Sequence, residues 1–180
     1  MKGATSAAEQ IFLLSIRQVF CIMGPVMKMT EYSILCEQLK SLIEGVPFQT
    51  ANLANASALL WQELPDLNWA GFYLRRGREL VLGPFQGKPA CIRIPWGRGV
   101  CGTAAETGLT QRVENVHDFP GHIACDCASN SEIVVPILNG GEVAAVLDLD
   151  SPLFSRFTPA DQQGLEAFVR ILEAEWGNMT

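Results

Sequence analysis

Basic residues are scarce in this chain of 180 residues, which has 13 Lys and Arg against 19 Asp and Glu and a formal net charge of −6. Proteins that bind nucleic acid through its phosphates need clustered basic side chains, so the composition argues against nucleic acid as a partner. Aromatic residues are also few, at 8% of the chain. The length is that of one domain, which would bury about two thirds of the surface of the unfolded chain.

Long apolar runs are lacking as well. Residues 11–27 are rather apolar, but Arg17 and Gln18 interrupt them and Gly24-Pro25 breaks the run. The run is therefore well short of the roughly 20 residues of a membrane-spanning helix. A clearly basic start, which would mark a signal peptide, is missing too. We therefore expect a cytoplasmic protein with no membrane partner, in which thiols start out reduced.

Two helices are expected before any strand. Apolar residues at helical spacing predict a helix over residues 30–45 and a second over about residues 50–65. The apolar stripe of the first helix consists of Tyr32, Leu35, Leu39, Leu42 and Ile43. Residues 1–29 do not resemble the start of a domain. We predict that residues 1–29 are an N-terminal extension outside the core and that residues 30–180 form a single domain.

Strand patterns follow the two helices. Short apolar segments at residues 69–75, 79–85 and 91–96 and in TQRVEN predict strands. IVVPIL and EVAAVLDLD flank Asn139-Gly140-Gly141, a sequence that favours a hairpin turn. A final helix is expected to begin at Thr158-Pro159 and to bury one apolar stripe. That stripe consists of Leu165, Phe168, Val169, Leu172 and Trp176. This order of elements is typical of an α+β fold.

Alternation assigns the faces of two strands. In EVAAVLDLD, one face should carry Val146, Asp148 and Asp150, so that two carboxylates share one side of the sheet. The opposite face should carry Val143, Ala145, Leu147 and Leu149. In residues 91–96, Ile92 and Ile94 should share one face and Cys91 and Arg93 the other.

The six cysteines are Cys21, Cys36, Cys91, Cys101, Cys125 and Cys127. Cysteines that are retained in a reducing compartment are free, metal-bound or catalytic. Cys101 falls in the first turn of a short helix that should end at Gly108, and the start of a helix favours a thiolate. Cys125 and Cys127 fall in residues 116–131, a loop long enough to suggest a function. Cys21 and Cys36 are interpreted as small apolar residues of a core.

No metal site is expected from these spacings. His122, Cys125 and Cys127 form HxxCxC, which is not one of the usual structural zinc patterns. The two histidines, His117 and His122, are expected to be loop residues that make local hydrogen bonds.

Four segments of the chain carry a resemblance, and they are NWAGFYL, LVLGPFQGKPACIRIPWGRGVCGTA, GHIACDCASNSEIVVPI and AAVLDLDS. Together these segments resemble the free methionine-R-sulfoxide reductases, which are enzymes built on a GAF domain. The resemblance implies a GAF-like fold, in which a six-stranded antiparallel sheet is flanked by helices and a small closed pocket is present. It also implies that free methionine-R-sulfoxide is reduced to methionine, with no cofactor and with thioredoxin as the external reductant. Whether two chains associate as a homodimer stays open.

Reduction of a sulfoxide by thiols needs a thiolate to attack sulfur, an acid to protonate the oxygen and a second thiol to resolve the sulfenic acid. The resemblance implies that Cys125 is the nucleophile and that Cys91 and Cys101 are the candidates for the resolving thiol. The position of Cys101 is the alternative for the nucleophile. Cys127 is not a position that the family requires.

The remaining groups implied by the resemblance are acids and aromatic rings. Glu132, Asp148 and Asp150 should bind the substrate, whose ammonium group anionic side chains can hold, and Glu132 and Asp150 should also serve catalysis. Clustered carboxyl groups raise one another's pKa, which would leave one of them able to donate a proton near neutral pH. Trp69 and Tyr73 should wall the pocket, although by default such residues belong to a core.

Two other functions fit the same fold. A GAF domain can be a sensor that binds a small ligand, but such a pocket has no need of several cysteines. A thiol-based redox sensor without turnover would use Cys101 and Cys125, but it would need no cluster of carboxylates.

Overall fold

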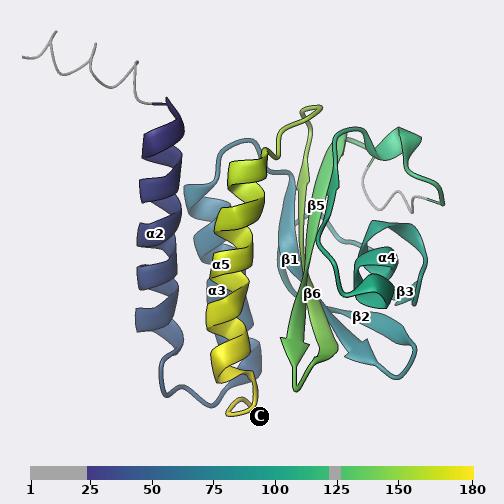
Figure 1. Cartoon of the computed structure of the whole chain (residues 1–180). Helices are drawn as coiled ribbons and strands as arrows, with labels where there is room; N and C mark the ends of the chain where they lie inside the picture. The colour runs from purple at the N-terminus through teal and green to yellow at the C-terminus, as the bar shows by residue number, and fades with distance from the viewer. Residues whose placement is uncertain (1–23, 122–126) are drawn as a thin grey trace, which may run out of the picture.

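A computed structural model of the chain describes residues 24–121 and 127–180 (Figure 1). Its strands are β1 (Trp69–Arg76), β2 (Glu79–Gly87), β3 (Arg93–Pro95), β4 (Gln111–Val113), β5 (Ser131–Asn139) and β6 (Glu142–Ser151). Its helices are α2 (Gly24–Ile43), α3 (Gln49–Glu63), α4 (Gly99–Thr107), α5 (Pro159–Trp176) and the short 3-10 helix η1 (Val116–Asp118). In the described part of the chain, the strands form one six-stranded antiparallel sheet in the order β3-β2-β1-β6-β5-β4. The predicted α+β class and the six-stranded antiparallel sheet are confirmed.

Helices α3 and α5 lie against one face of the sheet, α2 packs on the outer side of these two helices, and α4 lies against the other face of the sheet (Figure 1). The larger core lies under the three helices, where Leu39, Leu60 and Phe168 pack with Leu147 of β6. Leu42 was predicted to lie in this core, but 44% of its surface is exposed. Helix α2 begins six residues before the predicted start at residue 30. None of the helices described is both long and apolar enough to cross a membrane.

Helix α5 begins and packs as its sequence predicts. Thr158 is its N-cap, and the Thr158 side chain and Asp161 form a reciprocal capping box. The predicted stripe on α5 is buried throughout. The assignment of residues 1–29 as an extension stays a prediction, since residues 1–23 lie outside the described residues.

The β5–β6 hairpin brings the acidic face of β6 into the centre of the sheet. Its turn is formed by Gly140 and Gly141, whose φ angles of 61° and 85° are favourable for glycine. The alternation predicted for β6 is correct from Ala145 onward. It is wrong for Val143, because the register shifts between Ile137 and Leu138 of β5 and turns Val143 to the opposite face, where it packs with Val146.

The segment before α4 also departs from the prediction. Only residues 93–95 form a strand, and Ile92 is 70% exposed whereas Ile94 is buried. The prediction that both isoleucines share a face is therefore wrong, because the regular alternation of a strand starts only at Arg93. Helix α4 follows as predicted, and it ends before Gly108.

Candidate functional site

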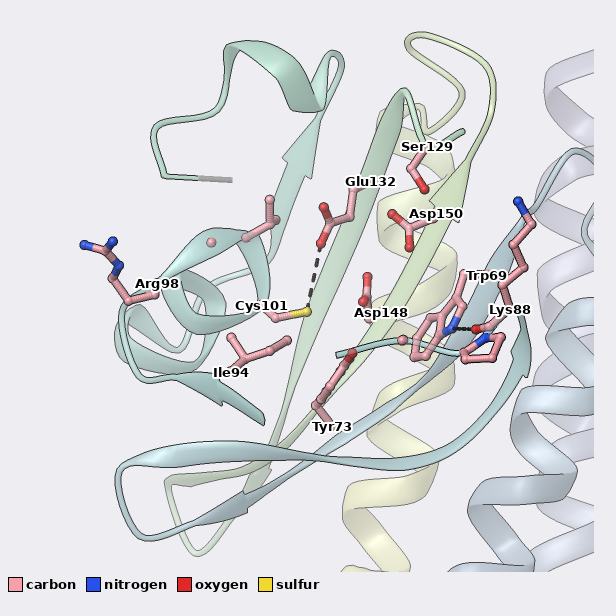
Figure 2. Close-up of a pocket in the computed structure, with 14 residues that line it drawn as sticks. Trp69, Tyr73, Lys88, Ile94, Arg98, Cys101, Ser129, Glu132, Asp148 and Asp150 are labelled. Carbon is pink, nitrogen blue, oxygen red and sulfur yellow. Dashed lines mark hydrogen bonds between the residues drawn. The ribbon is translucent and has the colours of Figure 1, made fainter. Parts of the chain in front are cut away.

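A small cavity lies on the α4 side of the sheet (Figure 2). The cavity has a volume of about 30 Å³ and is partly open to solvent among the described residues, so it is a small hollow and no groove for a polymer. Among the described residues, its lining includes Trp69, Tyr73, Cys101, Glu132, Asp148 and Asp150. These residues come from β1, α4, β5 and β6.

The register of β5 and β6 brings the three acids together. Glu132 of β5 is the cross-strand partner of Asp150 of β6, so their side chains leave the sheet on the same face. Asp148 lies two residues before Asp150 and shares that face. Glu132 and Asp148 are each only 6% exposed. The predicted sharing of one face by the two aspartates is confirmed, and Glu132 of the neighbouring strand joins them.

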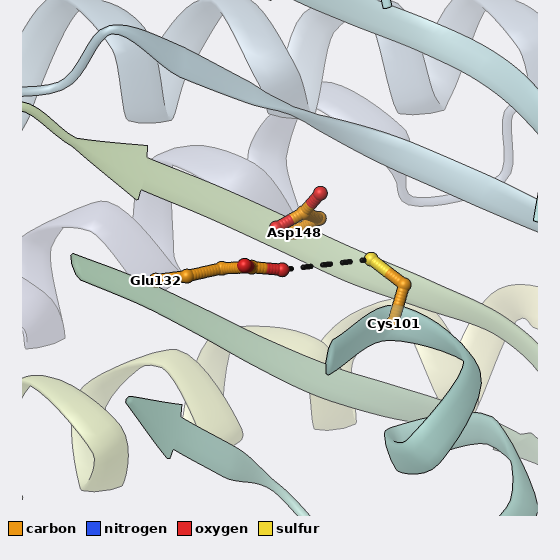
Figure 3. A group of neighbouring side chains, drawn as sticks. All are labelled: Cys101, Glu132 and Asp148. Atoms are coloured by element: carbon orange, nitrogen blue, oxygen red, sulfur yellow. Dashed lines mark hydrogen bonds between the residues drawn. The ribbon is translucent and has the colours of Figure 1, made fainter. Parts of the chain in front are cut away.

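Helix α4 adds a thiol to these acids. Cys101, which is 4% exposed, lies in the first turn of α4, and its Sγ lies 3.9 Å from Oε1 of Glu132. One side-chain atom each of Cys101, Glu132 and Asp148 lies within 4.8 Å of the other two (Figure 3). Cys101 thus meets two acids that come more than 30 positions later in the sequence.

The thiol of Cys101 is held in its protonated form. Burial raises its pKa well above the ordinary value, and the nearby charges of Asp148 and Glu132 raise this pKa further. The prediction that the start of a helix would favour a thiolate here is therefore wrong. The reason is that burial and neighbouring carboxylates oppose the negative charge more strongly than the helix dipole favours it.

The two buried carboxyl groups also hold protons tightly. Burial raises the pKa of Glu132 well above its usual range, with the charges of Asp148 and Asp150 as the next causes. Burial raises the pKa of Asp148 to about 7, although its contacts with Cys101 and Glu132 offset part of this effect. Like charges were expected to be the main cause, but burial is the larger one. The cavity therefore contains carboxyl groups that can donate a proton near neutral pH.

Aromatic rings form the wall next to β1. The ring of Trp69 stacks on that of Tyr73, with 5.7 Å between their centroids. Nε1 of Trp69 donates a hydrogen bond to the carbonyl oxygen of Lys88 at 3.2 Å, and the hydroxyl of Tyr73 donates one to the carbonyl oxygen of Cys91 at 3.0 Å. The two rings thus close one side of the cavity and also hold the segment 88–91 beside it.

Comparisons with known proteins agree with this arrangement. Residues 48–176 match the GAF domain family. A relative from Escherichia coli (strain K12), named free methionine-R-sulfoxide reductase, is 56% identical over 142 residues, which cover 79% of this chain and 86% of that protein. The chain belongs to the free methionine-R-sulfoxide reductase family.

Two solved structures of this family resemble the chain over most of its length. One is fRMsr of Staphylococcus aureus in complex with substrate, with 51% identity, a TM-score of 0.77 and coverage of 80% of this chain and 94% of that one. The other is free methionine-R-sulfoxide reductase from Neisseria meningitidis in complex with its substrate, with 42% identity, a TM-score of 0.81 and coverage of 84% of this chain and 91% of that one.

The cysteines expected from the free methionine-R-sulfoxide reductase family differ in their surroundings. Cys101 lines the cavity, whereas Cys91 is half-buried and packs beside it. Cys125 lies outside the described residues, as do Cys21 and His122. Cys127 is exposed. Cys36 is half-buried against the core under the helices, away from the cavity, which agrees with its interpretation as a core residue.

Sequence reasoning missed three polar residues of the cavity, which are Lys88, Arg98 and Ser129. Ser129 is buried in the lining and accepts a hydrogen bond from Nδ2 of Asn68 at 2.9 Å. This bond ties the end of the loop to the start of β1. A serine in a polar loop carries no signal of burial, so only the folded chain reveals it. His117 makes the local hydrogen bond that was expected, from its backbone N–H to Oδ1 of Asn115 at 3.1 Å, and its Nε2 lies 3.0 Å from Oδ1 of Asn130.

Proposed function

We propose that this protein reduces free methionine-R-sulfoxide to methionine, with cysteine thiols as the immediate reductant. The observation that carries the proposal is that a thiol, three carboxyl groups and two aromatic rings line one small cavity. The chain is also 56% identical to a protein named for this activity. A small hollow supports a free amino acid as the substrate, because a residue within a polypeptide would need room for the chain on both sides.

The ammonium group and the apolar groups of the substrate have matching groups in the cavity. The ammonium group is assigned to Asp148 and Asp150, with Glu132 nearby, because a cation favours partly desolvated carboxylates. Oδ1 of Asp148 is buried and has no hydrogen-bond partner among the described residues, so a donor from the substrate would satisfy it. The methyl and methylene groups are assigned to the rings of Trp69 and Tyr73.

The chemistry begins with a cysteine thiolate, which attacks the sulfoxide sulfur while a carboxyl group donates a proton to the sulfoxide oxygen. Methionine leaves, and the oxygen stays on the enzyme as a sulfenic acid. A second thiol then attacks the sulfenic sulfur to form a disulfide and water. Glu132 or Asp150 is assigned as the acid. The raised pKa of Glu132 supports this role, because the carboxyl group keeps its proton near neutral pH.

Cys125 is proposed as the attacking thiol. The raised pKa of Cys101 makes it a poor nucleophile in the resting protein, since the thiolate is the reactive form. This favours Cys125 for the attack. Cys101 and Cys91 then remain as the resolving candidates. Cys91 is only half-buried, and this supports contact with an external reductant. Thioredoxin in the cytoplasm is proposed to reduce the disulfide, and the cycle needs no bound cofactor.

The proposal is tested by supplying each sulfoxide epimer of free methionine together with a thioredoxin regeneration system. We expect methionine from the R epimer alone. In a single turnover without reductant, Cys125→Ser should give no methionine, whereas the variant of the resolving cysteine, Cys91→Ser or Cys101→Ser, should still give one equivalent. Cys36→Ser is the matched control and should behave as wild type. Binding without turnover, which a sensor would show, or equal loss of both epimers would contradict the proposal.

A further inference from the structure

We propose that Cys101, Glu132 and Asp148 form a binding site for a thiophilic divalent cation of the Zn²⁺ class. This site differs from the HxxCxC pattern considered above, because it shares no residue with that pattern. Its ligands come from α4, β5 and β6, so no local spacing in the sequence indicates it.

The geometry is close to that of a coordination sphere. Zn²⁺ binds thiolate sulfur at about 2.3 Å and carboxylate oxygen at about 2.0 Å, so a tetrahedral ion places the two ligand atoms about 3.5 Å apart. Sγ of Cys101 and Oε1 of Glu132 are 3.9 Å apart, and all three ligand atoms lie within 4.8 Å of one another. Small side-chain rotations would bring them onto one ion.

The burial of these ligands also points to a cation. All three side chains are more than nine-tenths buried. Asp148 lies beside Cys101 and Glu132 (Figure 3), and its Oδ1 has no hydrogen-bond partner among the described residues. A buried carboxylate oxygen without a partner is costly, and a metal ion would satisfy it together with its two neighbours.

The cavity supplies the remaining coordination position. Its free space of about 30 Å³ adjoins all three ligands, and one water molecule needs about 10–15 Å³ by the same measure. Binding would form one metal–sulfur and two metal–oxygen bonds and would release the protons of the thiol and the carboxyl groups to solvent, with no change of oxidation state. Sulfur in the ligand set favours Zn²⁺ or Cd²⁺ over Mg²⁺ or Ca²⁺.

Occupation of this site would inhibit the reductase. The ion would hold Asp148, which is assigned to the substrate ammonium, together with the neighbouring Glu132, and it would mask the thiol of Cys101. This consequence rests on the proposed function, whereas binding of the cation does not. The inhibition should therefore be competitive with substrate and reversed by a chelator.

The test is a titration of the full-length reduced protein with Cd²⁺, whose bond to thiolate gives an ultraviolet charge-transfer band. Compared with wild type, Cys101→Ser should lose one equivalent of bound Cd²⁺. Asp148→Asn, which has almost the same shape, should bind that equivalent about 10–100-fold more weakly. Cys36→Ser, which changes a half-buried thiol elsewhere, should keep it. Circular dichroism checks that each variant is folded, and if Cys101→Ser does not fold, Asp148→Asn decides.

The inference is overturned if the Asp148 variant, or a folded Cys101 variant, binds Cd²⁺ as tightly and in the same amount as wild type. In that case the ion is held by other thiols. A parallel assay of methionine formation with Zn²⁺ and then EDTA separates the two proposals. Cation binding by a protein that never forms methionine would refute only the reductase function, and methionine formation without the specific equivalent of Cd²⁺ would refute only the cation site.

Discussion

The buried carboxyl group of Asp148 makes a quantitative prediction about stability. Replacing it by asparagine keeps the shape of the side chain and removes the ionisable group. Burial raises the pKa of Asp148 from 3.8 to about 7. The folded protein therefore binds this proton more tightly than the unfolded chain does, and in the wild type stability must fall as the pH rises between these two values.

The expected size follows from that shift. The shift is about three pKa units, and each unit corresponds to about 1.4 kcal/mol. Below about pH 4 both states of the wild type carry the proton, and Asp148 changes stability little. Above about pH 7 its ionisation costs about 4 kcal/mol, which is a large fraction of the usual stability of a domain. Asp148→Asn avoids this cost, so the stability of this variant relative to wild type should rise by about 4 kcal/mol between about pH 4 and about pH 7.

Urea denaturation under reducing conditions, followed by circular dichroism at several pH values from about 4 to 8, measures the effect. Glu142→Gln is the control, since Glu142 is an exposed residue of the same strand that pairs with Arg75 at 2.8 Å. An exposed ion pair contributes less than about 1 kcal/mol, so this variant should follow the wild type. The Asp148 variant should gain stability while losing methionine formation.

The reasoning fails if the difference in stability between Asp148→Asn and wild type is the same at about pH 4 and pH 8. That result would mean that burial does not raise the pKa of this carboxyl group. A shift of the same size in Glu142→Gln would also contradict it, because the effect would then belong to the charge of the strand as a whole.

Three further predictions concern other parts of the site. In the native reduced protein at neutral pH, iodoacetamide should modify exposed Cys127 well before Cys101, because burial and neighbouring carboxylates oppose the Cys101 thiolate. Mass spectrometry of the labelled peptides measures the order, and earlier labelling of Cys101 would contradict the prediction. Gly71→Ala should lower the free energy of unfolding in urea by about 1–3 kcal/mol, because the added Cβ would overlap the side chains of Phe85 and Trp69. In the control Gly177→Ala, the added Cβ meets nothing within 4 Å, so the free energy of unfolding should hardly change. Tyr73→Phe should lose about 0.5–1.5 kcal/mol with its hydrogen bond of 3.0 Å, and no loss of stability would show that the bond contributes nothing.

Most of the fold could be predicted because its signals are local. The apolar stripe of α5, its cap at Thr158 and the glycine turn of the β5–β6 hairpin depend on residues within a few positions of one another. One error occurred where a partner strand intervenes. Val143 faces the other way because of a shift in register against β5, and no pattern within β6 alone reports that shift.

The candidate site was only partly predictable. The common face of Asp148 and Asp150 follows from alternation in one strand. The expectation that the start of its helix favours a thiolate at Cys101 was wrong, because it considered only that helix. The carboxylates that oppose the thiolate lie on two strands that come 31 or more positions later in the sequence.

The sequence by itself determined the helices and strands, the hairpin and the side of β6 that carries its acids, because these depend on the repeat of the backbone over neighbouring residues. Only the tertiary structure decided that Cys101 meets Glu132 and Asp148, and how deeply the three are buried. Depth of burial sets the cost of a charge, and it depends on every segment packed around the group. The protonation of this site is therefore a property of the folded chain.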